Sequence, residues 1–295
     1  MESPGYIHTF SDAEQERLIR QGAFLEPYIH PVIDLAPGSE VLEIGCGVGA
    51  QIRILLKRHP MIRLTGVDIA GVQLARARVF LDEEIKDGRA VLAEASGNAL
   101  PFADRSFDAI CMFWLLEHVR DPLPILREAD RVLRPDGLIY CTEVFNAGFH
   151  VQPPAPALAR YWRAFNDYQV ALGGAPDIGA HLADLASATG LSVEWLCDAP
   201  VILDRRLTGQ EARIGFVTYW KDLLLSAADG LLAQTRVDRT LIGDMVHALD
   251  SLVDEDDAVL YYAPRQLRAR KRRESGTARV QDGLSHSATT SRGIS

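Results

Sequence analysis

The chain has 295 residues, of which 47% are hydrophobic and 24% are charged, as in an ordinary globular protein. This composition excludes fibrous and disordered classes, and the length favours one large domain or one domain with insertions. The net charge of −9 is uneven, because residues 264–295 carry +6 whereas residues 1–263 carry −15. An acidic body repels phosphate backbones, so we do not expect nucleic acid as a partner.

Cysteine usage and terminal patterns bear on the cellular compartment. The four cysteines, Cys46, Cys111, Cys141 and Cys197, show no CxxC spacing. This argues against a zinc site and a disulfide framework and fits a reducing cytoplasm. The N-terminal segment has no signal-peptide pattern, and no stretch approaches the roughly 18 apolar residues of a membrane span. We therefore predict a cytoplasmic protein without a metal site or a membrane anchor.

The first predicted element is a helix that begins at a capping box. Ser11 is the predicted N-cap, with Glu14 reaching back to it. After this helix, short apolar runs typical of buried strands alternate with patterns typical of helices. The predicted strands are Val41–Ile44, Leu64–Val67, Val91–Ala93, Phe107–Phe113 and Leu138–Thr142, and the predicted helices are 49–58, 71–86 and 122–133.

This alternation predicts an α/β fold, in which crossover helices cover both faces of a doubly wound, parallel, Rossmann-like sheet. After residue 143 the pattern changes to segments rich in Pro, Ala and aromatics. There we predict a helix at 178–188, a strand at Leu191–Leu196, a long helical segment at 209–253 and a last strand at Ala258–Ala263. Proline donates no ladder hydrogen bond, so the last strand should end or bulge at Pro264.

Four segments follow from these patterns. Residues 1–38 form a helical lid, 39–148 a Rossmann-like core, 149–270 helical substrate-lid inserts with the last strands, and 271–295 a disordered tail. The basic run at 268–273 is interpreted as the solvated end of a helix or strand leading into this tail, in preference to a tethering patch.

The strongest motif is Val41–Ala50, a buried strand running into a glycine-rich turn and a helix. Glycines let the backbone approach a ligand closely, and the helix N-terminus offers amides to an anionic group. Asp68, at the end of the second strand, can accept both ribose hydroxyls of an adenosine moiety. These two motifs fit NAD as well as S-adenosylmethionine.

At this point the sequence resembles the class I S-adenosylmethionine-dependent methyltransferases, in the small-molecule branch with the ubiquinone and menaquinone biosynthesis enzymes. The resemblance covers roughly residues 6–265 and implies a seven-stranded sheet. It rests on five ordered motifs: Glu43–Gly49, Gly66–Asp68, Leu100–Phe102 with Ser106–Asp108, Leu116–Pro122, and Leu126–Glu128 with Arg131–Gly137.

The resemblance implies S-adenosylmethionine as the cofactor, with S-adenosylhomocysteine as product. The first glycine loop would line its methionine and ribose end through Glu43, Gly45, Cys46, Gly47 and Gly49, with Asp68 on the ribose and Ile69 against the adenine. Similar enzymes place an acid before Leu100, whereas this chain has Ser96, so adenine recognition would fall to Ser96, Gly97 or Asn98. The resemblance also implies that Trp114 contacts the cofactor and that Tyr6 closes over its methionine end.

Methyl transfer from a sulfonium mainly requires alignment of the acceptor and exclusion of water. In similar enzymes the loop after the fourth strand faces the reacting methyl. His118 lies in this loop, and a histidine side chain can take a proton near neutral pH, although a packed, non-catalytic histidine is the competing interpretation. Glu143 is the second catalytic candidate, orienting His118 or binding an amine, and Glu117 is a candidate acceptor contact.

Aromatic side chains in the inserts predict an acceptor pocket, because apolar binding sites are commonly lined in this way. Core packing is the competing interpretation for each of them. The candidate acceptor-binding residues are Phe149, Tyr161, Trp162, Phe165, Phe216 and Trp220.

The leading hypothesis is a methyltransferase acting on an O or N atom, less readily S, of a small, partly apolar metabolite, in specialised-metabolite biosynthesis. A non-catalytic S-adenosylmethionine-binding scaffold or regulator on the same fold is the first alternative. A NAD(P)-dependent oxidoreductase is the second, permitted only by Gly45, Gly47 and Ala50. The oligomeric state is left open, with a homodimer among the alternatives.

Overall fold

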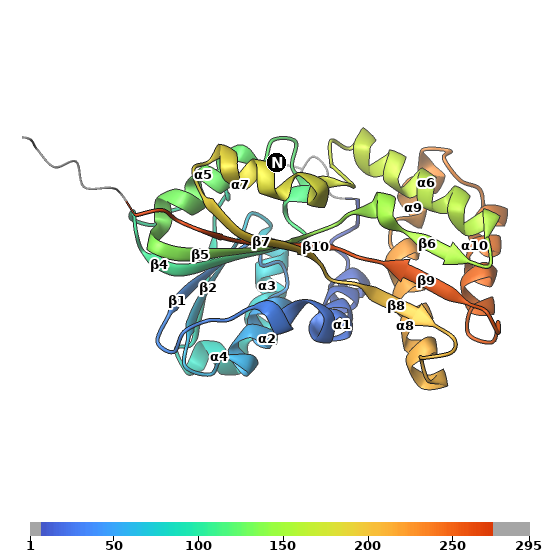
Figure 1. Cartoon of the computed structure of the whole chain (residues 1–295), viewed down its shortest axis with the longest axis horizontal. Coiled ribbons are helices and arrows are strands. Elements are labelled where there is room, and N and C mark those ends of the chain that lie inside the picture. Colours follow the sequence, from blue (N-terminus) through green and yellow to red (C-terminus); the bar gives the residue numbers. More distant parts are fainter. Residues whose placement is uncertain (1–6, 274–295) are drawn as a thin grey trace, which may run out of the picture.

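The structure is a computed structural model that describes residues 7–273 (Figure 1). Its centre is a seven-stranded sheet in the order β3-β2-β1-β4-β5-β10-β7. Strands β1 to β5 pair in parallel, whereas β10 runs antiparallel to β5 and β7. The predicted α/β fold is thereby confirmed. The strands are β1 (Glu40–Ile44), β2 (Arg63–Asp68), β3 (Ala90–Glu94), β4 (Phe107–Phe113), β5 (Leu133–Glu143), β7 (Ser192–Asp198) and β10 (Arg265–Arg270).

Helices cover both faces of this sheet (Figure 1). One face carries α1 (Asp12–Ile29), α2 (Ala50–Arg58), α3 (Gly71–Phe80) and α4 (Asp82–Lys86), and the other carries α5 (Leu123–Val132) and α7 (Leu182–Ala188). Side chains alternate between the faces along a strand. On β4, Cys111 and Phe113 join the apolar cluster beneath α1 and α2, whereas Ile110 and Met112 join the cluster beneath α5 and α7.

A second lobe continues the main sheet. Its three-stranded sheet has the order β6-β9-β8, formed by β6 (His150–Gln152), β8 (Val201–Asp204) and β9 (Val259–Tyr262). Each strand follows or precedes a main-sheet strand in the chain: β5 leads to β6, β7 leads to β8, and β9 leads to β10. The lobe is completed by α6 (Pro156–Ala171), α8 (Gln210–Leu225), α9 (Ala228–Ala233) and α10 (Arg239–Ser251). Short 3-10 turns lie at His30–Val32 (η1), Leu116–His118 (η2), Asn146–Gly148 (η3) and Ile178–His181 (η4).

The start of α1 differs in one detail from the predicted capping box. The Ser11 hydroxyl accepts the Glu14 amide at 3.3 Å, as expected of an N-cap. The Glu14 carboxylate instead accepts two hydrogen bonds from the Arg17 guanidinium, at 2.6 and 2.7 Å. Both side chains are buried, and a bidentate ion pair is the better partner for a carboxylate at a buried position.

Two predicted helices are broken in the structure. The segment predicted as one helix at 71–86 is divided at Leu81 into α3 and α4, and the long segment at 209–253 is divided into α8, α9 and α10. The second division follows from local chemistry. Thr235 adopts a left-handed φ of 52°, and the Asp238 carboxylate accepts the Leu241 amide at 2.7 Å, which begins a new helix.

The end of the chain holds the largest correction to the predicted elements. The predicted last strand corresponds to β9, which lies in the small sheet, and Pro264 ends it as expected. The main sheet is completed by β10, which includes part of the basic run. Arg268 and Arg270 pair with Glu194 on β7, so residues 268–270 of the run belong to a paired strand, whereas residues 271–273 follow the end of that strand, as predicted. Arg265, before the run, pairs with Asp198 at 2.9 Å. The tail predicted to be disordered lies outside the described residues, apart from 271–273.

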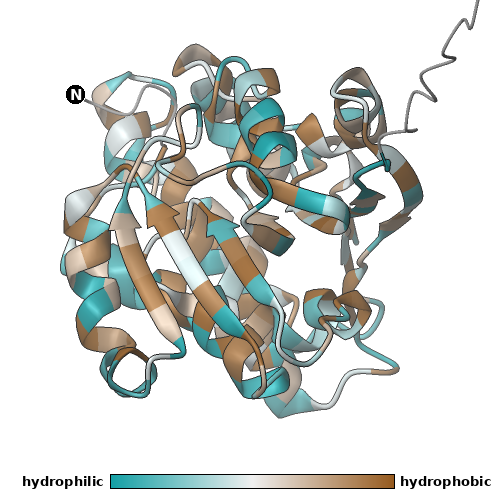
Figure 2. Cartoon of the chain, turned by 90° about the vertical axis from the view of Figure 1, so that its left-hand side faces the viewer, coloured by the Kyte–Doolittle hydropathy of each residue, from teal (hydrophilic) through white to brown (hydrophobic). Residues whose placement is uncertain are grey.

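Figure 2 shows that strands of the main sheet are largely apolar, whereas the helices beside them mix apolar and polar residues. Between residues 7 and 273, none of the helices combines the length and the apolar character that crossing a bilayer requires.

Candidate functional site

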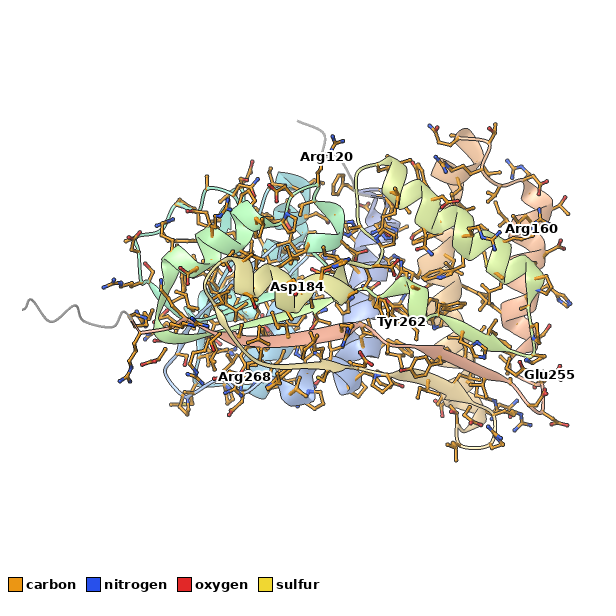
Figure 3. All side chains as sticks on the ribbon, turned by 45° about the horizontal axis from the view of Figure 1, so that its top comes forward. Arg120, Arg160, Asp184, Glu255, Tyr262 and Arg268 are labelled. Carbon is orange, nitrogen blue, oxygen red and sulfur yellow. The ribbon has the colours of Figure 1, made fainter. Side chains whose placement is uncertain are left out.

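A cavity of about 590 Å³ opens where β1, β2 and β4 end and the second lobe begins. The carboxyl ends of parallel strands are the usual ligand site of such sheets. The cavity is bounded by the loops after these strands, by residues 7–10 with α1, and by α6 and α8. Tyr262, also in its wall, lies where β9 passes into the main sheet (Figure 3). The site therefore spans both lobes.

The glycine loop after β1 lines one half of the cavity. The Gly45 and Cys46 amides donate to the Val67 carbonyl, at 2.8 and 3.0 Å, and fasten the loop to β2. Gly47 adopts a φ of 50°, with open space where a Cβ would lie, and its amide donates to Asp68 at 2.8 Å. A side chain at this position would be strained and would fill the cradle.

Asp68 is oriented toward the cavity by two backbone amides. Its Oδ2 accepts from Gly47 and its Oδ1 accepts from Ala70, each at 2.8 Å. Burial raises the pKa of Asp68, and these two amide hydrogen bonds oppose that rise. A carboxylate held in this way has acceptor lone pairs left for the hydroxyls of a ribose.

A buried carboxylate oxygen of Glu43 bears on whether the site fits S-adenosylmethionine. Its side chain lines the cavity and is 1% exposed, and its Oε2 finds no hydrogen-bond partner among residues 7–273. Burial, followed by the neighbouring Asp68, raises the pKa of Glu43 well above its ordinary value. An ammonium group would satisfy this oxygen and favour the charged carboxylate. The residues present therefore fit the aminoacyl end of the cofactor.

The residues that the resemblance implies for the adenine, Ile69, Ser96, Gly97 and Asn98, all line the cavity. The Ser96 hydroxyl accepts the Asn98 amide at 3.3 Å, so its proton remains able to donate elsewhere. Glu43, Gly45, Cys46, Gly47, Asp68 and Trp114 also line the cavity. Trp114 has a φ of 50°, an uncommon conformation for a bulky residue that is often found at functional sites. Tyr6 lies outside the described residues.

At the other half of the cavity, η2 presents Glu117 and His118. Glu117 Oε1 lies 3.6 Å from His118 Nε2, and Glu117 Oε2 accepts from Gln169 at 2.6 Å. Burial raises the pKa of Glu117, whereas His118, Gln169 and Arg17 lower it. The result is a histidine beside a buried carboxyl group in the cavity wall, an arrangement that can accept a proton.

Several candidate residues lie elsewhere. Tyr161, Phe216 and Trp220 are buried in the apolar core of the second lobe, and Phe149 packs on Trp162 and Trp220 with ring centroids 4.8 and 5.0 Å away. Of the six predicted aromatic contacts, Trp162 and Phe165 form cavity wall. Helical periodicity identified the correct helices. It could not distinguish aromatic residues that face the core from those that face a ligand.

Two further predictions need correction. Gly49 is the N-cap of α2, with a φ of 80°, and its backbone packs against Leu81 and not against the cavity. Glu143 is fully buried, and its carboxylate accepts the amides of Leu115, Leu116 and Glu117. A carboxylate enclosed by backbone donors in this way is not placed to bind an amine or to act on an acceptor.

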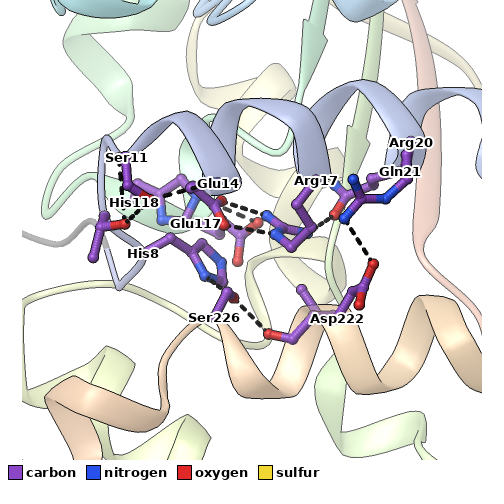
Figure 4. Close-up of polar contacts among 12 residues, drawn as sticks. His8, Ser11, Glu14, Arg17, Arg20, Gln21, Glu117, His118, Asp222 and Ser226 are labelled. Carbon is purple, nitrogen blue, oxygen red and sulfur yellow. Dashed lines mark hydrogen bonds and ion pairs between the residues drawn. The ribbon is translucent and has the colours of Figure 1, made fainter.

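Sequence reasoning missed a polar wall on α1 and the segment before it (Figure 4). Arg17 lines the cavity and also donates to Gln21 at 2.5 Å, and His8 bonds through Nδ1 to the Ser226 hydroxyl at 2.6 Å. Burial, followed by Arg17 and His118, lowers the pKa of His8. The spacing of Glu14, Arg17 and Gln21 at i, i+3 and i+7 was a usable signal of one polar helix face.

The fold and the cavity fit a class I S-adenosylmethionine-dependent methyltransferase domain. Residues 42–141 match the family described as "Methyltransferase domain", which confirms the resemblance seen in the sequence. Residues 7–273 contain no group of three or more His, Cys, Asp and Glu arranged to hold a metal.

Known relatives are similar over part of their length. The 27-O-demethylrifamycin SV methyltransferase of Amycolatopsis mediterranei is 33% identical over 44% of this chain and 47% of that protein. The O-methyltransferase rstn1 of Aspergillus nomiae is 29% identical over 55% of this chain and 72% of that protein. The chain spans about half the length of most of the curated relatives it matches.

Solved structures extend the likeness of fold to the second lobe. The geranyl diphosphate C-methyltransferase of Streptomyces coelicolor A3(2), solved with Mg²⁺, geranyl diphosphate and S-adenosylhomocysteine, has a TM-score of 0.51. The match covers 85% of this chain and 77% of that chain at 14% identity, so it bears on the fold alone.

Proposed function

We propose that the protein transfers a methyl group from S-adenosylmethionine to an O or N atom, less readily S, of a small, partly apolar metabolite. One observation carries the proposal. Asp68 and Glu43, which suit the cofactor, and Glu117, His118 and Trp162, which suit an acceptor, line the same continuous cavity. Two ligands bound there would meet inside one water-poor space, which favours group transfer.

The chain's own residues have separate tasks in this proposal. The cofactor, when bound, supplies a methyl group on a sulfonium that is already activated for in-line displacement. Glu43, the loop at 45–47 and Asp68 bind its aminoacyl and ribose groups, while Ile69 and the segment 96–98 enclose the adenine. Trp162 and Phe165, stacked with ring centroids 5.6 Å apart, hold the apolar body of the acceptor and exclude water. His118, beside Glu117, takes the proton of a hydroxyl or ammonium acceptor.

The relatives favour an oxygen acceptor in specialised metabolism. The similar proteins named above are the O-methyltransferase rstn1 and the 27-O-demethylrifamycin SV methyltransferase. The acidic body favours a small-molecule acceptor over nucleic acid. The free cysteines described by the structure suit a reducing compartment such as the cytoplasm. In this proposal the N-terminal helix and the second lobe form the walls that close the site.

The test is a methyl-transfer assay with S-adenosylmethionine and a panel of phenols, alcohols, amines and thiols, read by mass spectrometry. We expect S-adenosylhomocysteine to form together with an acceptor that has gained one methyl group. Binding of S-adenosylmethionine without turnover of any acceptor class would favour the non-catalytic scaffold instead.

A further inference from the structure

The turn that carries Glu117 and His118 is held from the sheet side by one carboxylate. Glu143 Oε1 accepts from the Leu115 and Leu116 amides at 2.9 and 2.7 Å, and its Oε2 accepts from the Glu117 amide at 3.3 Å. Glu143 is 0% exposed at the end of β5. Burial, followed by the neighbouring Glu117, raises the pKa of Glu143 well above its ordinary value, and the three amides oppose that rise. Three consecutive amides on one buried carboxyl group fix the backbone of η2.

On the side of the second lobe, the same turn is held by the end of α6 and by the segment that follows it. Gln169, also 0% exposed, donates from Nε2 to Glu117 Oε2 at 2.6 Å, and the Ala175 amide donates to the Glu117 carbonyl at 2.8 Å. Gly174 lies so close that a Cβ there would be 2.7 Å from the Glu117 carbonyl oxygen. The backbone of this segment therefore packs directly on the turn.

The two sides leave little freedom to Glu117. Its amide, its carbonyl and one carboxylate oxygen are bound, whereas Oε1 faces His118 at 3.6 Å. Trp162, Phe165 and Gln169 stand at positions i, i+3 and i+7 of α6, so they share one face of this helix. The helix that walls the acceptor half of the cavity is thus hydrogen-bonded to the turn that presents His118.

We propose that Glu143 and Gln169 are positioning residues that together fix Glu117 and His118 at the acceptor end of the cavity. This inference rests on the proposed function. Neither side chain touches the cofactor half of the cavity. Their loss therefore acts on the chemical step and leaves the binding of S-adenosylmethionine nearly unchanged.

The experiment compares Glu143→Gln and Gln169→Leu with the wild-type protein, using the phenol or amine that the wild type methylates fastest. In Glu143→Gln, the new side chain keeps one acceptor oxygen, but its NH2 group cannot accept from a backbone amide. In Gln169→Leu, the new side chain keeps a similar buried volume but has no hydrogen-bond donor. The matched controls are Glu128→Gln, a carboxylate that accepts the Leu100 amide at 2.8 Å, and Gln266→Leu, a buried glutamine that donates to the Ile29 carbonyl. Both controls lie outside the cavity wall.

We expect kcat to fall at least about 10-fold in both variants, with the affinity for S-adenosylmethionine and the KM of the acceptor within about threefold of wild type. The double variant should be little slower than the slower single variant, because either loss already frees the turn. The controls should keep kcat within about threefold of wild type.

A kcat within about threefold of wild type in folded Gln169→Leu would overturn the proposal. So would parallel loss of kcat and S-adenosylmethionine affinity in both variants, since that indicates a general structural role. If Glu143→Gln does not fold, Gln169→Leu decides alone. A wild-type protein that methylates no acceptor contradicts the proposed function itself, so the two failures are distinguishable.

Discussion

The carboxylate of Asp68 accepts the amide of Gly47 at 2.8 Å, and this hydrogen bond joins the end of β2 to the loop after the neighbouring strand β1. A second amide, from Ala70, holds the other carboxylate oxygen. The carboxylate is therefore oriented before any ligand arrives, which removes part of the ordering cost of binding. Gly47 donates from a left-handed φ of 50°, a conformation that favours glycine, so the glycine and the aspartate work as one unit.

Replacing Asp68 should therefore weaken the binding of S-adenosylmethionine first. For Asp68→Ala we expect a loss of about 2–3 kcal/mol, or roughly 30- to 150-fold in Kd, as is typical of hydrogen bonds to a charged group. Asp177→Ala is the control, because Asp177 also accepts a backbone amide, that of Ala147 at 2.7 Å, but stands outside the cavity wall. Calorimetry that gave Asp68→Ala the wild-type Kd would contradict the role of this residue.

His118 should show the opposite pattern. We expect His118→Ala to lower kcat by about 10²- to 10⁴-fold, the usual contribution of a general base, with the affinity for S-adenosylmethionine nearly unchanged. His181→Ala, in the turn before α7, is the control. Single-turnover kinetics with a phenol or amine acceptor make the measurement. Unchanged turnover would support the packed, non-catalytic interpretation of His118.

Two tryptophans, one in the cavity wall and one in the core, allow a matched comparison. Trp162 lines the cavity, whereas Trp220 is 0% exposed and belongs to the core of the second lobe. We expect Trp162→Ala to raise the acceptor KM about tenfold. Trp220→Ala should cost about 3–5 kcal/mol of unfolding free energy and leave KM within about twofold. Steady-state kinetics and urea unfolding of both variants make the measurement. Equal effects of the two substitutions on the acceptor KM would contradict the assignment of Trp162 to the acceptor site and of Trp220 to the core.

His30 predicts a measurable pH dependence of stability. Burial lowers its pKa to about 4, although a hydrogen bond to Gln51 opposes the shift. Between pH 4 and 6.5 the unfolded chain therefore binds a proton that the folded chain does not. Stability is lost as pH falls through this window, by up to about 3 kcal/mol from this residue.

The test is the slope of unfolding free energy against pH, from urea titrations at several pH values between 4 and 7.5. His30→Leu should give a flatter slope than wild type, and His150→Leu, at an exposed position on β6, should not. A slope identical to wild type in His30→Leu would show that the pKa of His30 is the same in the folded and unfolded states, and would contradict the lowering by burial.

The sequence predicted the parts of the molecule that follow local rules. The glycine loop, Asp68 and the strand-helix alternation are short-range patterns, and the structure brings Glu43, Gly47 and Asp68 to one cavity. What local patterns could not show was how distant segments meet. Gln169 reaches Glu117 across 52 residues, and His8 reaches Ser226 across 218.

The same limit explains the errors at the end of the chain. β10 carries Arg265, Arg268 and Arg270, whose charges conceal a strand in the middle of a sheet. These side chains are stabilised by Glu194 and Asp198 on β7, partners that the order of the sheet provides and the local pattern does not. The position of Glu143 at the end of a strand predicts a residue that orients His118 or binds an amine, but the backbone amides that enclose its carboxylate come from another loop and are not visible in the local pattern.

The most direct test of the account is isothermal titration of the purified protein with S-adenosylmethionine and S-adenosylhomocysteine, with NAD and NADP as controls. The account predicts micromolar binding of both adenosyl ligands, one per chain, and no binding of either dinucleotide. Binding of a dinucleotide without either adenosyl ligand would contradict the assignment of the cavity and favour an oxidoreductase.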